Sequence, residues 1–150
     1  MQPIAAGSVA PRLPDVDLDA GPWAILFYKV TCPVCQLAAP PLGEFERAYP
    51  GRLRAIGQDP PAKLAAFGDR FGWPFLSVPD LPPYPASSAY GIRVVPTLVL
   101  VGPDRTVVDV AESWDREAYN RISKRLADLT GAPFVPVSRQ GDGLPPFRPG

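Results

Sequence analysis

Short apolar runs alternate with longer amphipathic segments along the first half of the chain. Residues 23–29, WAILFYK, form an almost unbroken apolar run with the length of a buried central strand. Residues 32–48 carry apolar side chains at helical spacing, and residues 52–57 predict a short strand. A strand, a helix and a second strand therefore follow one another, as in a unit with parallel strands.

Prolines, glycines and capping residues mark where the next predicted elements begin and end. Residues 60–71 predict a helix that opens with two prolines, and we expect Asp59 to cap it and Gly72 to end it. Residues 75–78 predict a further strand. A proline-rich stretch then leads to a short helical turn at residues 87–90.

The second half of the domain changes order. Residues 96–102 and 106–112 predict two strands joined by a tight turn, and therefore a hairpin. The last helix has a buried stripe of apolar residues, with Ser113 as the expected N-cap and Gly131 as its stop. The full order, β-α-β-α-β-turn-β-β-α, predicts an α/β domain.

The chain divides into three regions on this pattern. We predict an N-terminal extension at residues 1–22, one domain at residues 23–131, and a proline-rich C-terminal tail at residues 132–150. Proline is abundant, with 22 residues in 150 against a usual share of about 5%. The tail has no periodicity, and we expect it to be extended and anchored by apolar side chains, namely Phe134, Val135 or Phe147.

Charge and hydropathy exclude several classes of partner. Fifteen basic residues balance fifteen acidic ones, so nothing points to nucleic acid or to an anionic membrane. The apolar runs are far shorter than the ~20 residues of a membrane span. No Lys or Arg precedes Arg12 and prolines interrupt the start, so we expect no secretory signal and, if Met1 is the true start, a cytoplasmic protein. We also predict a monomer.

Both cysteines lie in one motif, Cys32-Pro33-Val34-Cys35, at the junction between the first predicted strand and the first predicted helix. The first turn of a helix has unpaired N–H groups and a positive dipole end, so a thiolate there is stabilised and nucleophilic. Pro33 suits that turn, since its missing N–H costs nothing. Cys35 is one turn further on and within reach of Cys32, which favours a redox couple.

Two other uses of the thiols stay open at this point. Zinc needs about four nitrogen or sulfur ligands, whereas this chain has two thiols and no histidine, so only a dimer sharing two pairs would complete such a site. A structural disulfide across two residues closes too small a loop to stabilise much. We therefore expect no metal and no cofactor.

The motifs together resemble the thioredoxin superfamily, and within it the TlpA-like and redoxin-type thiol:disulfide oxidoreductases. The likeness rests on the C-x-x-C, on Pro40 five residues after the second cysteine, and on Val94-Val95-Pro96-Thr97 before a strand. Residues 56–80 and 90–108 are also similar, so that the match covers about residues 23–130. It implies a thioredoxin-like fold, a central mixed sheet flanked by helices, with an extra element between the C-x-x-C helix and the cis-proline strand.

The resemblance also implies roles. Cys32 would be the nucleophile and Cys35 the resolving thiol, exchanging electrons with protein disulfides and dithiols and with an unidentified thiol reductant. The Val95–Pro96 bond would be cis and would lie against the cysteines, with the Val95 backbone pairing with a substrate strand. The implied substrate-binding residues are Thr31, Pro33, Val95, Pro96 and Thr97. Without Cys32 in the same chain, the favoured interpretation of Pro96 would be an ordinary proline at the start of a strand.

The chain departs from the family at the usual proton acceptors. Thioredoxins have a buried acid six residues before the first cysteine, where this chain has Leu26, and TlpA-like proteins often have Glu three residues after the second, where it has Ala38. The usual Trp before the first cysteine is Thr31. Glu44 and Glu112 are the remaining candidates, and each can equally be a solvated surface charge.

Two competing functions follow from the same residues. A peroxiredoxin-like thiol peroxidase shares the downstream segment, but Val95-Pro96 stands where such enzymes have arginine, and Arg93 is out of register. A thiol metal carrier or binding module would suit Cu(I), yet Met1 is the single methionine and histidine is absent. The aromatic-rich segment 73–85 is either a partner surface or a loop packed on the core edge.

Overall fold

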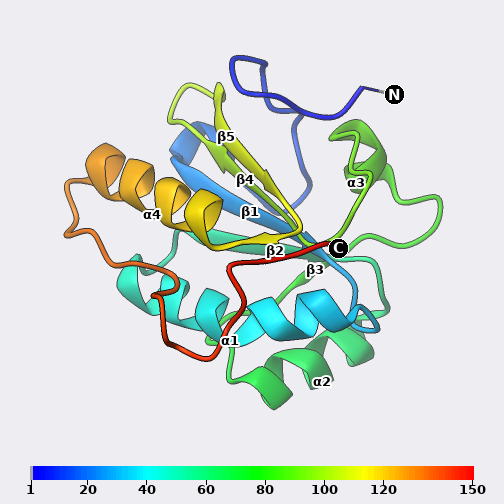
Figure 1. The fold of residues 1–150 in the computed structure, drawn as a ribbon. Coiled ribbons are helices and arrows are strands. Elements are labelled where there is room, and N and C mark those ends of the chain that lie inside the picture. Colours follow the sequence, from blue (N-terminus) through cyan, green and yellow to red (C-terminus); the bar gives the residue numbers. More distant parts are fainter. Residues whose placement is uncertain (1) are drawn as a thin grey trace.

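A five-stranded mixed sheet with helices on both faces forms the body of the computed structural model, which describes residues 2–150 (Figure 1). The strands lie in the order β3-β2-β1-β4-β5. The elements in chain order are a 3-10 turn at Leu18–Ala20, β1 Trp23–Tyr28, α1 Pro33–Ala48, β2 Leu53–Gly57, α2 Pro61–Phe71, β3 Val78–Pro79, α3 Pro85–Ala89, β4 Thr97–Val101, β5 Val107–Glu112, β6 Trp114–Asp115, α4 Arg116–Thr130 and β7 Phe147–Arg148.

Strand β1 occupies the centre of the sheet, and this explains its unbroken apolar run. All six of its residues are buried, because side chains on both faces lie under other elements. It pairs in parallel with β2 and antiparallel with β4. The predicted α/β order and the mixed sheet are therefore confirmed.

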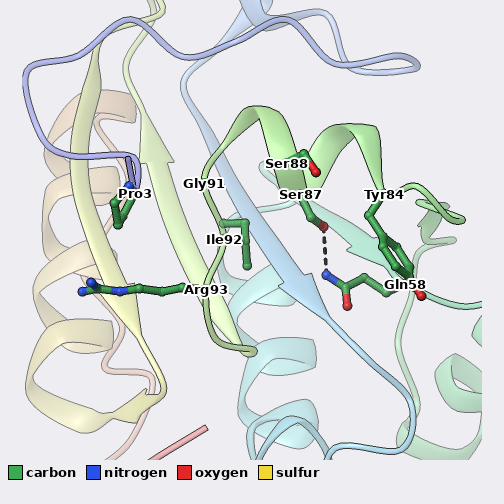
Figure 2. A pocket seen from close by; sticks show the side chains of 8 residues that line it. All are labelled: Pro3, Gln58, Tyr84, Ser87, Ser88, Gly91, Ile92 and Arg93. Carbon is green, nitrogen blue, oxygen red and sulfur yellow. Dashed lines mark hydrogen bonds between the residues drawn. The ribbon is translucent and has the colours of Figure 1, made fainter. Parts of the chain in front are cut away.

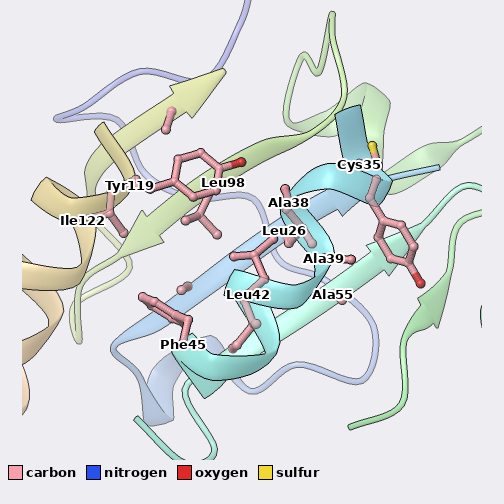
Figure 3. Close-up of a cluster of buried hydrophobic side chains, with 14 of the residues drawn as sticks. Leu26, Cys35, Ala38, Ala39, Leu42, Phe45, Ala55, Leu98, Tyr119 and Ile122 are labelled. Carbon is pink, nitrogen blue, oxygen red and sulfur yellow. The ribbon is translucent and has the colours of Figure 1, made fainter. Parts of the chain in front are cut away.

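One face of the sheet is covered by α1, α2 and α4. Their apolar stripes pack on Leu26, Ala55 and Leu98, among others, to form the larger part of the core (Figure 3). The opposite face is covered by α3 and by the segment before β1. Ala10 and Leu18 of that segment are buried with Phe27 and Tyr90, and the last two rings lie 5.1 Å apart.

The strand predicted at residues 75–78 is wrong in extent, because only Val78–Pro79 pairs with β2. The segment before it turns back on the core instead of joining the sheet. The rings of Trp73 and Phe75 stack 4.8 Å apart in this segment, and Leu76 is 85% exposed. The edge strand of the sheet beside β2, β3, is consequently only two residues long. The extra element implied between α1 and β4 stays a prediction, although β3 and α3 lie in that interval.

Both predicted N-caps are wrong. Helix α2 is preceded by Pro60 and has no side-chain cap, because Asp59 turns its carboxylate to the backbone N–H of Val30. Helix α4 is capped by Asp115, which accepts a hydrogen bond from the Ala118 N–H at 3.1 Å. Ser113 instead adopts a left-handed backbone with φ of 70° and lies before β6.

The tail, residues 132–150, is held on the body by polar contacts rather than by the predicted apolar anchors. Phe134, Val135 and Phe147 each remain more than 40% exposed, so their anchoring role is wrong. Asn120 holds the middle of the tail instead. Its side chain accepts hydrogen bonds from the Val137 and Ser138 N–H groups and donates to the Ser138 carbonyl.

Within residues 2–150, none of the helices is both long enough and apolar enough to cross a membrane. Met1, the residue considered as a copper ligand, lies outside the described residues.

Candidate active site

Cys32 lies at the junction between β1 and α1, where the sequence predicts it. Its backbone is extended, its side chain is the N-cap of α1, and its Sγ accepts a hydrogen bond from the Cys35 N–H at 3.2 Å. The sulfur therefore lies against the first turn of α1. Cys32 is half-buried and Cys35 is only 3% exposed, and both are free thiols here.

The two thiols differ in their electrostatic surroundings. Burial raises the pKa of the Cys35 thiol far above its usual range, and its hydrogen bond with Cys32 and the negative charge of Asp59 raise it further. The Lys29 backbone has a smaller opposing effect. Cys35 is therefore neutral at physiological pH, and the partly exposed Cys32 is the thiol that a large reagent can reach.

The loop before β4 meets the thiols because of the strand register. Phe27 pairs with Thr97 in the antiparallel β1–β4 ladder, so the residues after β1 and those before β4 lie at one edge of the sheet. The Val95–Pro96 peptide bond is cis, as the resemblance implies. The Cys32 thiol donates to the Val95 carbonyl oxygen over 3.6 Å.

The other predicted site residues divide into an exposed and a buried group. Thr31 and Pro33 are exposed on either side of Cys32. Pro96 and Thr97 are buried, and the Thr97 hydroxyl donates to the Val94 carbonyl at 2.8 Å. The buried Thr97 side chain therefore stabilises the cis-proline loop through its hydrogen bond to the Val94 backbone.

Neither acid considered from the sequence stands free for the resolving thiol. Glu44 is highly exposed and pairs with Arg47 at 2.7 Å. Glu112 forms a two-bond pair with Arg93 on the surface, which lowers the pKa of that carboxyl. Leu26 fills the position of the thioredoxin acid and is buried in the apolar layer under α1 (Figure 3).

Asp59 is the acidic residue that sequence reasoning missed. It lies two residues after the end of β2 and is 8% exposed, and its Oδ2 accepts a hydrogen bond from the Val30 N–H at 2.9 Å. Because β1 and β2 are parallel, their carboxyl ends lie at one edge, which brings Asp59 under the loop that carries Cys32. That strand pairing was the signal available in the sequence.

A cavity of about 510 Å³ lies beside the segment that leads from α3 to the cis-proline loop. Figure 2 shows Gln58, Ser87, Ile92 and Arg93 among the residues around it, with Gln58 donating to Ser87. Neither cysteine lines it. Among residues 2–150, no cluster of three or more His, Cys, Asp or Glu side chains forms a possible metal site.

Comparisons with known proteins agree with this geometry at the level of the fold. No protein-family model and no curated protein matches the sequence. Solved structures do match. One is a crystal structure assigned as thiol:disulfide interchange protein DsbE from Chlorobium tepidum, with a TM-score of 0.71 and 15% identity over 84% of this chain and 98% of that one.

Two further structures are similar over most of their length. The thioredoxin domain of a thiol-disulfide oxidoreductase from Bacteroides vulgatus has a TM-score of 0.69 and 18% identity, over 82% of this chain and 99% of that one. DsbF of Mycobacterium tuberculosis, solved in mixed oxidised and reduced forms, has a TM-score of 0.61 and 21% identity, over 73% and 81%. The chain has a thioredoxin-like fold. Within that fold, its structural neighbours are thiol:disulfide oxidoreductases, and it carries a C-x-x-C pair at the start of α1.

Proposed function

We propose that the protein is a thiol:disulfide oxidoreductase whose Cys32–Cys35 pair exchanges electrons with protein disulfides. One observation carries the proposal. The Cys32 sulfur caps α1, receives the Cys35 N–H, and lies 3.6 Å from the carbonyl that precedes a cis proline. A nucleophile, its resolving thiol and a strand-like docking group are therefore within one small region.

The reaction divides between the thiols according to their exposure. Cys32, as thiolate, attacks one sulfur of the partner disulfide, and the other sulfur leaves and takes up a proton. Cys35 then loses its proton and attacks the Cys32 sulfur, which releases the second partner thiol. The partner gains two electrons and two protons, and Cys32–Cys35 becomes a disulfide until an external dithiol reduces it.

The Val95 backbone supports docking of an extended partner segment. Its carbonyl faces Cys32, and among residues 2–150 its N–H makes no hydrogen bond. An extended strand from a partner can pair with such groups by β-augmentation. Thr31 and Pro33, exposed beside Cys32, would then contact the same segment.

Reduction of insulin disulfides in the presence of dithiothreitol tests the proposal. We expect the wild-type protein to accelerate precipitation of the insulin B chain, and the Cys32→Ser variant to behave like the uncatalysed control. Equal rates for the two proteins would reject the function. Consumption of hydrogen peroxide by the same samples tests the peroxidase alternative. The cytoplasmic location stays a prediction.

A further inference from the structure

The end of the tail crosses the molecule toward the candidate active site. Figure 1 shows it, in red, running to the segment that leads from α3 into β4. Phe147–Arg148 forms an antiparallel pair with Trp114–Asp115, the two residues that precede α4. The Arg116 N–H also donates to the Pro146 carbonyl at 3.0 Å. The tail thus adds a strand beside the loop that follows β5.

Gly150 brings this strand onto the cis-proline loop. Its N–H donates to the Ser113 hydroxyl at 3.0 Å, and the Ser113 N–H donates to the Pro96 carbonyl at 2.8 Å. The Gly150 backbone lies so close to Val95 that a Cβ at this position would overlap the Val95 carbonyl oxygen and lie 3.5 Å from Pro96 Cδ.

The contact involves the same carbonyl that faces the nucleophile. The Val95 oxygen lies 3.6 Å from the Cys32 sulfur, and the Gly150 backbone packs against it. We propose that residues 147–150 occupy, within the chain itself, the place where an extended protein segment docks. This inference rests on the proposed function, and it makes the tail a competitor of the protein partner.

The attachment of residues 147–150 differs from that of the tail before them. The Arg116 side chain donates to Ser138 at 2.9 Å and to the Leu144 carbonyl at 2.7 Å, and Trp114 donates to the Pro145 carbonyl at 2.7 Å. These bonds are partly shielded from water. Residues 147–150 are all exposed, and Phe147 is 52% exposed. The end of the tail can therefore leave while the preceding residues stay in place.

A tail that covers the docking position multiplies the apparent affinity for a partner by the fraction of time for which the position is free. The effect applies to a disulfide presented by an extended protein segment, which needs the Val95 backbone. A small-molecule disulfide needs only the exposed part of the Cys32 sulfur. The two kinds of substrate should consequently respond differently to loss of residues 147–150.

Deletion of residues 147–150 tests the proposal, with second-order rate constants of the reduced protein measured for insulin and for hydroxyethyl disulfide. We expect the rate with insulin to rise about three- to tenfold, as for a position covered most of the time, and the rate with hydroxyethyl disulfide to change less than about twofold. An unchanged or lower rate with insulin would overturn the inference and leave the proposed function standing. Failure of the wild-type and deleted proteins to react with either disulfide would overturn both.

Two substitutions test whether displacing the end of the tail has the same effect on the rate with insulin as deleting it. Gly150→Val keeps the chain length but introduces a Cβ that overlaps the Val95 oxygen, so we expect a rise with insulin in the same direction as the deletion. Arg148→Ala is the matched control. It removes an exposed side chain and leaves the backbone pairing with Trp114, so its rate should equal the wild-type rate. If Arg148→Ala raised the rate with insulin as much as Gly150→Val, the proposal that the backbone of residues 147–150 competes with the partner segment would be contradicted.

Discussion

The Asp59 carboxylate accepts a hydrogen bond from the Val30 backbone N–H at 2.9 Å, two residues before the half-buried thiol of Cys32. Gln36 completes the support of the same residue by donating to the Val30 carbonyl at 2.9 Å. The loop between β1 and α1 is therefore fixed at both polar groups of Val30. Asp59, two residues after β2, does not occupy either of the positions at which the family has its acid, Leu26 and Ala38 here. It nevertheless places a negative charge near the Cys35 thiol.

The first prediction concerns that charge. Burial is the main reason that the pKa of Cys35 is raised, and the Asp59 charge adds to it. Asp59→Asn keeps the shape of the side chain and removes the charge, so the pKa of Cys35 should fall and more Cys35 thiolate should be present at neutral pH. We expect resolution of a mixed disulfide on Cys32 to become severalfold faster and its pH profile to shift to lower pH.

Stopped-flow release of the mixed disulfide across pH checks this prediction, with Asp69→Asn, an exposed acid on α2, as the control. The control should match the wild type. A slower resolution in Asp59→Asn, or a profile moved to higher pH, would instead show that Asp59 accepts the Cys35 proton.

A second prediction concerns stability at alkaline pH. Because burial raises the pKa of Cys35 in the folded protein above its unfolded value near 9, the folded state holds this proton more tightly. That contribution is complete below about pH 9 and is lost as the pH rises further. The loss approaches about 1.4 kcal/mol per pH unit for one proton. Burial also raises the pKa of Tyr28 from 10 to about 12, which adds a further loss above pH 10.

Urea unfolding of the reduced protein between pH 8 and 11 measures this loss. The Cys35→Ala variant should show a flatter decline between pH 9 and 10, since it lacks the buried thiol, while Cys32→Ala keeps Cys35 and serves as its control. The prediction is contradicted if Cys35→Ala and the wild type lose stability in parallel over that interval.

A third prediction tests the N-cap of α4. Asp115 accepts the Ala118 N–H at 3.1 Å, so Asp115→Ala should lower the free energy of unfolding by about 1 kcal/mol. Glu117→Ala removes a neighbouring exposed acid without a cap and should change it by less than about 0.5 kcal/mol. Equal losses in the two variants, measured by urea denaturation, would assign the effect to the helix dipole rather than to the cap.

Apolar patterning predicted the elements that are buried on the sheet. Strands β1 and β4 are continuous apolar runs in the sequence because both of their faces are covered. Helices α2 and α4 have apolar stripes because only one face of each helix packs on the core. The position of Cys32 followed from the order of strand and helix. The proximity of Cys32 to Val95 was implied by the family resemblance and not by the apolar pattern. It depends on the antiparallel register of β1 and β4.

Features that depend on polar contacts between distant segments were not predictable from that pattern. Asp59 and Ser113 both have the residue type of an N-cap, but one turns to Val30 and the other to Gly150. The tail is fixed by Asn120 and Arg116 from α4, and these contacts leave no periodicity in the sequence. The predicted anchors Phe134, Val135 and Phe147 misled because their side chains remain largely exposed on the surface.

Trapping of a mixed disulfide tests the central claim most directly. Cys35→Ser and Cys32→Ser proteins, each reduced, are incubated with insulin, and the adducts are identified by mass spectrometry after acid quenching. With Cys32 as the accessible nucleophile and Cys35 as the buried resolving thiol, Cys35→Ser accumulates an insulin adduct on Cys32 and Cys32→Ser accumulates none. Equal adducts on the two variants, or an adduct only on Cys35, would contradict the account.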